Sequence, residues 1–177
     1  MLWSIAFGDL GVVVSDLYFV DPDPAEGQEG AERGVRLELR LFDREPLQGS
    51  IYSATPIRVG RPLWRVDLLE SVDSAPGSLD RAHHHPRFAG WEPGRRVFVE
   101  ELSARPVEWL RARLADPAAV LAEAGEDPAA HAADVTALQA AAPLVTGTVE
   151  HLLAEVTAGR AGVAPDGAGD SVRASWL

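Results

Sequence analysis

The alternation of apolar and charged residues from position 35 to 41 constrains the fold most strongly. Valine or leucine occupies every second position, and arginine or glutamate fills the positions between them. Because successive side chains of a strand point to opposite faces of a sheet, this pattern predicts a strand with one buried face. Similar segments recur through the first hundred residues, and their short connections favour antiparallel order. The expected strands cover residues 2–7, 12–20, 35–42, 51–59, 63–72, 79–85 and 95–99.

The pattern becomes helical after Leu102. Ser103 can cap a helix that reaches about Leu114. Asp-Pro pairs at 116–117 and 127–128 are typical helix starts, and the alanine-rich residues 129–142 have helical propensity. A last helix is expected between Thr148 and Ala158.

These patterns predict an α+β fold. We expect an antiparallel, partly curled sheet of about five to seven strands in the first hundred or so residues, packed by about three or four C-terminal helices. A chain of 177 residues fits one domain, covering residues 1–159. Residues 160–177 are rich in glycine and alanine, which predicts a flexible tail.

The composition excludes several kinds of chemistry. The net charge of -11 argues against non-specific binding to nucleic acid or to an anionic membrane. The chain contains neither lysine nor cysteine, which excludes a Schiff base, a thiol nucleophile, a disulfide and a thiolate metal site. The apolar N-terminal segment lacks a basic start and carries two aspartates. We therefore expect a cytoplasmic protein without a membrane span.

Three consecutive histidines precede Pro86 and form the most informative local motif. Proline disfavours helical geometry at the preceding residue, so the triplet is expected to be extended. In a strand His83 and His85 then share one face, roughly 6–7 Å apart, and His84 faces away. Two imidazoles at this spacing can share a divalent ion such as Zn, Fe, Mn or Ni, with Glu92 as the expected third ligand and Asp80 as its alternative.

The same segment also favours a small anionic ligand. Residues 57–96 hold seven arginines against five acidic residues, in a chain that is otherwise strongly acidic. Guanidinium groups are well suited to carboxylates and phosphates. Arg81, His84 and Arg87 are therefore predicted to hold the anion.

The histidine segment resembles the first metal motif of the cupins. Gly77 is followed by five residues and then by His83-His84-His85, as in the glycine, five residues, His-x-His pattern. The resemblance implies a small β-barrel with a divalent metal bound by His83 and His85. Glu92 would correspond to the cupin glutamate, although it follows after six residues instead of three or four.

A second resemblance is to small RNase-type toxins, carried by the Trp64-Arg65-Val66-Asp67 strand followed by His84-His85-Pro86. It implies that one imidazole deprotonates a ribose hydroxyl, that another protonates the leaving oxygen, and that Arg81 or Arg87 neutralises the phosphorane. Residues 50–125 as a whole are similar to hypothetical proteins of high-GC actinobacteria, which implies no activity.

The sequence therefore leaves several functions open. The protein can bind a divalent metal ion, a small anion or both at the histidine segment, or act there as an RNase-type nuclease. It can instead be a non-enzymatic assembly module that forms a homo-oligomer or binds a protein partner through the sheet and the alanine-rich helix. The triplet can also be only a polar turn whose rings bond to backbone carbonyls. Whether the protein is an enzyme is not decided by the sequence.

Overall fold

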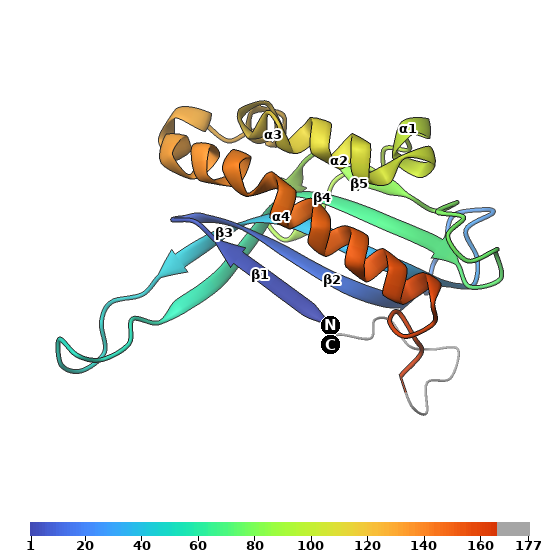
Figure 1. The fold of residues 1–177 in the computed structure, drawn as a ribbon, viewed down its shortest axis with the longest axis horizontal. Coiled ribbons are helices and arrows are strands. Elements are labelled where there is room, and N and C mark those ends of the chain that lie inside the picture. The colour runs from blue at the N-terminus through green and yellow to red at the C-terminus, as the bar shows by residue number, and fades with distance from the viewer. Residues whose placement is uncertain (166–177) are drawn as a thin grey trace.

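The computed structural model describes residues 1–165 and contains one five-stranded antiparallel sheet with the strand order β1-β2-β3-β4-β5 (Figure 1). Each strand pairs with the next strand along the chain, so the sheet is a simple meander. Two very short strands form a separate small sheet. The strands are β1 (Leu2–Ala6), β2 (Leu10–Val20), β3 (Ala31–Arg44), β4 (Ile57–Ser71), β5 (His83–His85), β6 (Phe88–Ala89) and β7 (Glu92–Pro93).

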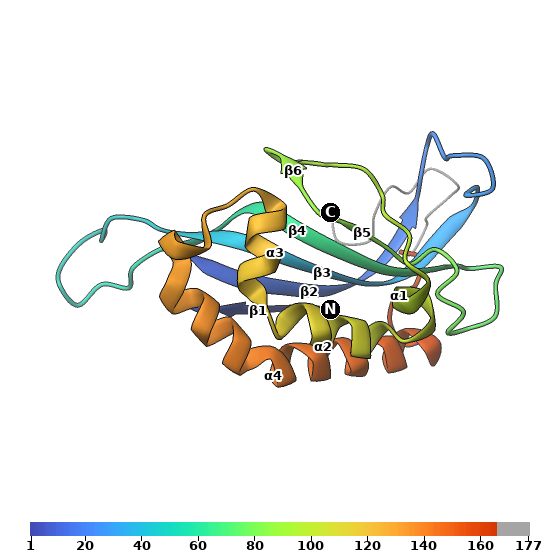
Figure 2. The ribbon, with the colours of Figure 1, turned by 90° about the horizontal axis from the view of Figure 1, so that it is seen from above.

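The helices follow the strands in the chain and cover one face of the sheet (Figure 2). They are α1 (Glu100–Ala104), α2 (Pro106–Leu114), α3 (Pro117–Ala124), the 3-10 helix η1 (Pro128–His131) and α4 (Ala132–Thr157). The predicted α+β fold, with its antiparallel sheet and C-terminal helices, is confirmed. No helix among the described residues combines the length and the apolar character that a membrane crossing requires.

The hydrophobic core lies between the sheet and the helices. Each of the three central strands contributes every second side chain, for example Val14, Leu37 and Val66, and all three are fully buried. On the helix side Leu110 and Val149 are equally buried. Burying a side chain of this size stabilises a fold by about 1.5–3 kcal/mol, so this layer supplies most of the stability.

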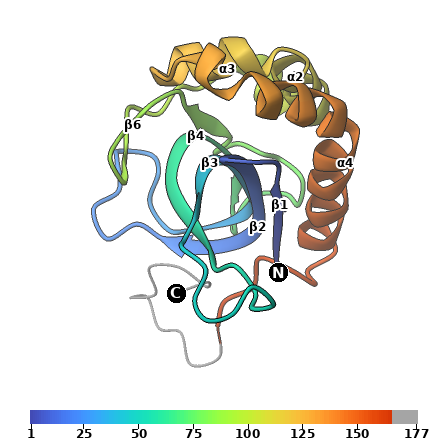
Figure 3. The same cartoon turned by 90° about the vertical axis from the view of Figure 1, so that its left-hand side faces the viewer.

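The sheet curls strongly, with the helices wrapped around its outside (Figure 3). β1 and β5 occupy the two ends of the strand order and are not paired with each other. The sheet therefore stays open, and the closed barrel implied by the cupin resemblance is not formed. The curl nevertheless encloses the second face of the sheet, whose side chains are largely polar.

Several elements differ from their predicted bounds. β4 is one strand that replaces the two expected over 51–59 and 63–72, and residues 51–56 belong to the turn before it. The expected strand over 95–99 is reduced to one bridge between His84 and Val97. The alanine-rich segment and the expected last helix form one helix, α4, which continues through Pro143.

The first residues of the predicted flexible tail are packed against the domain. Ala161 is buried in the core, and the backbone N–H of Gly162 donates to Asp16 Oδ2 at 2.8 Å. The rest of that predicted tail, residues 166–177, lies outside the described residues.

Gly34 lies where the backbones of β3 and β4 are in close contact, so a larger residue there should destabilise the sheet. A Cβ atom at this position would lie 2.0 Å from the Leu68 carbonyl oxygen. Gly34→Ala must push the two strands apart, and we expect it to lower the free energy of unfolding by about 2–3 kcal/mol. Urea denaturation followed by circular dichroism measures this loss.

Gly147→Ala is the matched control. Gly147 lies inside α4, and a Cβ atom there has no neighbour within 4 Å. Alanine favours the helix, so this variant should gain about 0.5–1 kcal/mol. Equal effects of the two substitutions would contradict the packing argument.

Candidate metal centre

The pairing of β5 with β4 sets the direction of each histidine. His83 lies opposite Asp67, His84 opposite Val66 and His85 opposite Arg65. Directly opposed residues share a face of the sheet, so His83 and His85 point into the curl together with Asp67. His84 points with Val66 toward the helices. This is the division of the triplet that the extended conformation before Pro86 predicts.

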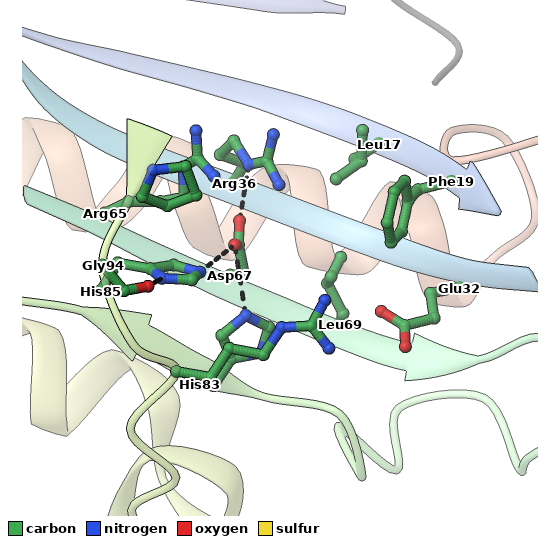
Figure 4. Close-up of a pocket in the computed structure, with 12 residues that line it drawn as sticks. Leu17, Phe19, Glu32, Arg36, Arg65, Asp67, Leu69, His83, His85 and Gly94 are labelled. Atoms are coloured by element: carbon green, nitrogen blue, oxygen red, sulfur yellow. Dashed lines mark hydrogen bonds and ion pairs between the residues drawn. The ribbon is translucent and has the colours of Figure 1, made fainter. Parts of the chain in front are cut away.

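Asp67, His83 and His85 form a compact buried group (Figure 4). Asp67 Oδ2 lies 3.5 Å from His83 Nε2 and 3.5 Å from His85 Nε2. One potential ligand atom from each residue lies within 4.8 Å of the other two. This group could hold a metal ion.

The other nitrogen of each imidazole is fixed by a backbone carbonyl. His83 Nδ1 lies 2.8 Å from the Arg81 carbonyl oxygen, and His85 Nδ1 lies 2.8 Å from the Gly94 carbonyl oxygen. A carbonyl oxygen only accepts, so each Nδ1 must carry the proton and donate it. In the neutral ring the lone pair is then on Nε2, which faces Asp67.

Asp67 is kept ionised by its neighbours. Burial alone would raise its pKa, but the Arg36 guanidinium holds the pKa of Asp67 well below its usual range. Arg36 Nε donates to Asp67 Oδ1 at 2.6 Å, which leaves Oδ2 for the histidines. Burial lowers the pKa of His83, and the negative charge of Asp67 opposes that effect.

A second cluster of charges lies beside this group on the same face. Arg65 Nε donates to Glu38 Oε1 at 2.8 Å, and Arg40 donates to Glu38 Oε2 at 2.5 Å. Burial and the nearby Arg36 lower the pKa of Arg65. This part of the inside of the curl is therefore a network of charged groups, in contrast to the apolar face that carries the helices.

A cavity of about 370 Å³ opens directly onto the three candidate ligands. Its size is in the range of small-molecule sites. It combines acidic, basic and apolar side chains, several of which Figure 4 labels. The lining residues are Leu17, Phe19, Glu32, Arg36, Arg65, Asp67, Leu69, His83, His85, Pro93, Gly94 and Arg96.

The predicted third ligands do not join the group. Glu92 is exposed on β7 and is not among the three clustered residues. Asp80 accepts hydrogen bonds from the Ser71 backbone and from the hydroxyl of Ser78, in the loop before β5. Asp67, instead of the predicted Glu92 or Asp80, is the carboxylate that lies with the two histidines.

The predicted anion-holding residues also lie elsewhere. Arg81 donates to the Gly27 carbonyl oxygen, and Arg87 donates to the Glu123 carbonyl oxygen at 2.5 Å. Neither arginine lines the cavity, and His84 faces the core instead. Arg36, Arg65 and Arg96 are the arginines that line the cavity.

His84 is a core residue. Its ring lies 5.2 Å from the Trp109 ring and 6.4 Å from the Trp64 ring, and the side chain is 5% exposed. Burial lowers the pKa of His84 to about 4, with the nearby Glu123 opposing the shift. The three adjacent histidines thus have two different roles.

Comparison with protein-family models, curated proteins and solved structures gave no match.

The pKa of His84 predicts a loss of stability in mild acid. The unfolded chain, with a histidine pKa near 6.5, binds this proton more readily than the folded protein, with a pKa of about 4. The contribution of neutral His84 to the free energy of unfolding should be fully present above pH 6.5. The free energy of unfolding should then fall by about 2–3 kcal/mol as the pH drops to 4. His84→Phe should remove most of this fall in urea denaturation curves recorded across that range. Identical pH profiles for the two proteins would contradict the assignment. A residual fall is expected from His83, whose pKa is also lowered.

Proposed function

We propose that the protein binds one divalent transition metal ion through Asp67 Oδ2, His83 Nε2 and His85 Nε2. The observation that carries this proposal is the orientation of the two imidazoles. Both Nδ1 atoms donate to backbone carbonyls, so two Nε2 lone pairs converge on one carboxylate oxygen. Three lone-pair donors facing one another repel unless a metal ion or a proton lies between them.

The distances support a shared ion. Ligand atoms about 2.0–2.1 Å from a tetrahedral Zn(II) lie about 3.3–3.4 Å from each other. The two Nε2 to Oδ2 distances of 3.5 Å agree with this spacing and are long for a direct hydrogen bond. The Nδ1 hydrogen bonds to carbonyl oxygens are also the usual outer contacts of metal-binding histidines.

Two imidazoles and one carboxylate favour Zn(II) or non-haem Fe(II). Such a set leaves coordination positions for water or a ligand, and the ion acts there as a Lewis acid. The chain contributes the surroundings: Arg36 orients Asp67, and the cavity gives access to the open side of the site.

Metal titration of the untagged protein tests the proposal. We expect about one Zn(II) or Fe(II) per chain after removal of adventitious metal, and a rise in melting temperature when metal is added. Asp67→Asn, His83→Gln and His85→Gln should each weaken metal binding by about a hundredfold or more, because each removes one of three ligands.

His84→Gln is the matched control, because this histidine adjoins both ligands in sequence but faces the core. It should destabilise the fold yet retain metal at wild-type stoichiometry. Circular dichroism of each metal-free variant separates loss of ligand from loss of fold. Metal binding that survives the His83→Gln/His85→Gln double substitution would refute the site.

Metal-free acid–base catalysis is a second candidate function. It is favoured by the two imidazoles, whose ring centroids lie 5.0 Å apart beside Arg65 and Arg36 in one cavity. The RNase resemblance would then involve His83 with His85, because His84 faces the core. Either ring could accept a proton while the other donates one.

The two functions are separated by a chelator. The acid–base function predicts that protein treated with EDTA cleaves a ribodinucleotide such as UpA, and that His85→Gln lowers the rate by about a hundredfold or more. Absence of cleavage by the wild-type protein, with and without metal, would exclude it. The net charge of -11 disfavours long RNA, which is why a dinucleotide is the suitable substrate.

A further inference from the structure

We propose that the cavity beside the metal centre binds a small zwitterion, with its anionic group at the metal end, its ammonium group at Glu32 and an apolar stem between them. This inference rests on the proposed metal site and specifies the class of molecule that would share it. Rows of side chains cross the strands on the inner face of the curl.

The register of β2, β3 and β4 orders three rows along the cavity. The first row contains Arg36 and Asp67 beside His83. The next contains Leu17, Gly34 and Leu69, and the last contains Phe19, Glu32 and Ser71. The cavity therefore runs from the metal centre across an apolar row to an acidic residue, and Figure 4 shows Asp67 and Glu32 separated along the strands.

Leu17 and Leu69 form the middle row of the cavity. They flank Gly34 on the two neighbouring strands, and both line the cavity. The row presents only apolar groups to the cavity, so it suits a methylene or aromatic stem instead of a second charge.

The metal end of the cavity is cationic once an ion is bound. Asp67 balances Arg36, but Glu38 is shared by Arg65 and Arg40, so one positive charge is in excess before an ion binds. A divalent ion adds two more positive charges. A carboxylate or phosphate on the open side of the ion reduces this excess.

Glu32 gives the other end an unbalanced negative group. Glu32 is 3% exposed and lines the cavity, and its carboxylate has no hydrogen-bond or ion-pair partner among residues 1–165. Figure 4 shows this carboxylate pointing toward the middle of the cavity. Burial raises the pKa of Glu32, although Arg96 and Arg81 oppose the shift.

The neighbouring Arg96 already has hydrogen-bond partners in the loop after β2. Arg96 donates to Asp21 Oδ2 at 3.2 Å and to the side-chain oxygen of Gln28. Its charge is therefore balanced by the loop after β2, and within residues 1–165 Glu32 has no hydrogen-bond or ion-pair partner of its own. A buried carboxylate in this position is stabilised by an ammonium or hydroxyl donor from a ligand.

The row spacing indicates the length of the ligand. Glu32 and Arg36 are four residues apart on β3, so their rows are separated by about 13 Å along the strands. The Glu32 side chain and the bound ion shorten the gap that a ligand must span. A six-carbon amino acid with its charges at opposite ends fits this gap and the 370 Å³ volume.

The test uses the full chain loaded with Zn(II) and simple matched probes. The probes are 6-aminohexanoate, hexanoate, hexylamine and hexyl phosphate, with 4-aminobutyrate as a shorter analogue. Chemical-shift titration of ¹⁵N-labelled protein measures weak dissociation constants. We expect 6-aminohexanoate to bind about tenfold more tightly than hexanoate, hexylamine or 4-aminobutyrate, since it alone satisfies both ends. Comparison of hexanoate with hexyl phosphate identifies the preferred anionic group.

Glu32→Gln is the decisive variant. It keeps the size of the side chain and removes its charge, so 6-aminohexanoate should lose about tenfold in affinity while hexanoate changes by less than about twofold. Glu26→Gln is the control, because Glu26 is exposed in the neighbouring loop and does not line the cavity. It should leave all affinities unchanged.

The outcomes distinguish this inference from the proposed function. If Zn(II) binds but the four six-carbon probes bind equally, or none binds, the zwitterion inference is overturned and the metal site stands. Equal loss of 6-aminohexanoate and hexanoate in Glu32→Gln also overturns it. If Zn(II) itself does not bind, the metal site fails and the inference fails with it.

Discussion

The ion pair between Asp67 and Arg36 is the interaction on which the inner face of the sheet depends. Asp67 is almost fully buried, and an uncompensated carboxylate there would cost several kcal/mol. Arg36 satisfies one carboxylate oxygen and thereby directs the other toward β5. Because the Asp67 carboxylate lies between them, His83 and His85 belong to a buried group that could hold a metal ion, and they do not form an isolated polar turn.

The alternation of the strands gives the sheet two unlike faces. One face carries apolar side chains that the helices bury, and the other carries charges that the curl encloses. The same residue type serves both faces in β5, where His84 packs beside Trp64 and Trp109 while its neighbours face the cavity. A shift of one residue in the pairing of β5 would exchange these roles and destroy both.

The sequence predicted what depends on local pattern. The strand around Leu37, the α+β class and the shared face of His83 and His85 follow from alternation and from Pro86. Asp67 was not assigned as a ligand because its role depends on how β4 pairs with β5 across an intervening loop. A signal was present, since Asp67 alternates with Val66 and Leu68 on a strand near the histidines. Glu92 was closer to a known motif spacing, but the turn between β6 and β7 leaves it exposed.

All three proposed ligands belong to one hairpin, formed by β4 and β5, whereas the far walls of the cavity come from β2 and β3. An ion there would fasten β5, the shortest strand of the main sheet, to its neighbour and close the loop between them. In this proposal, the metal ion and the ligand depend on different parts of the chain. Substitutions at Phe19 or Glu32 could change which molecule is accepted while the ion keeps its ligands.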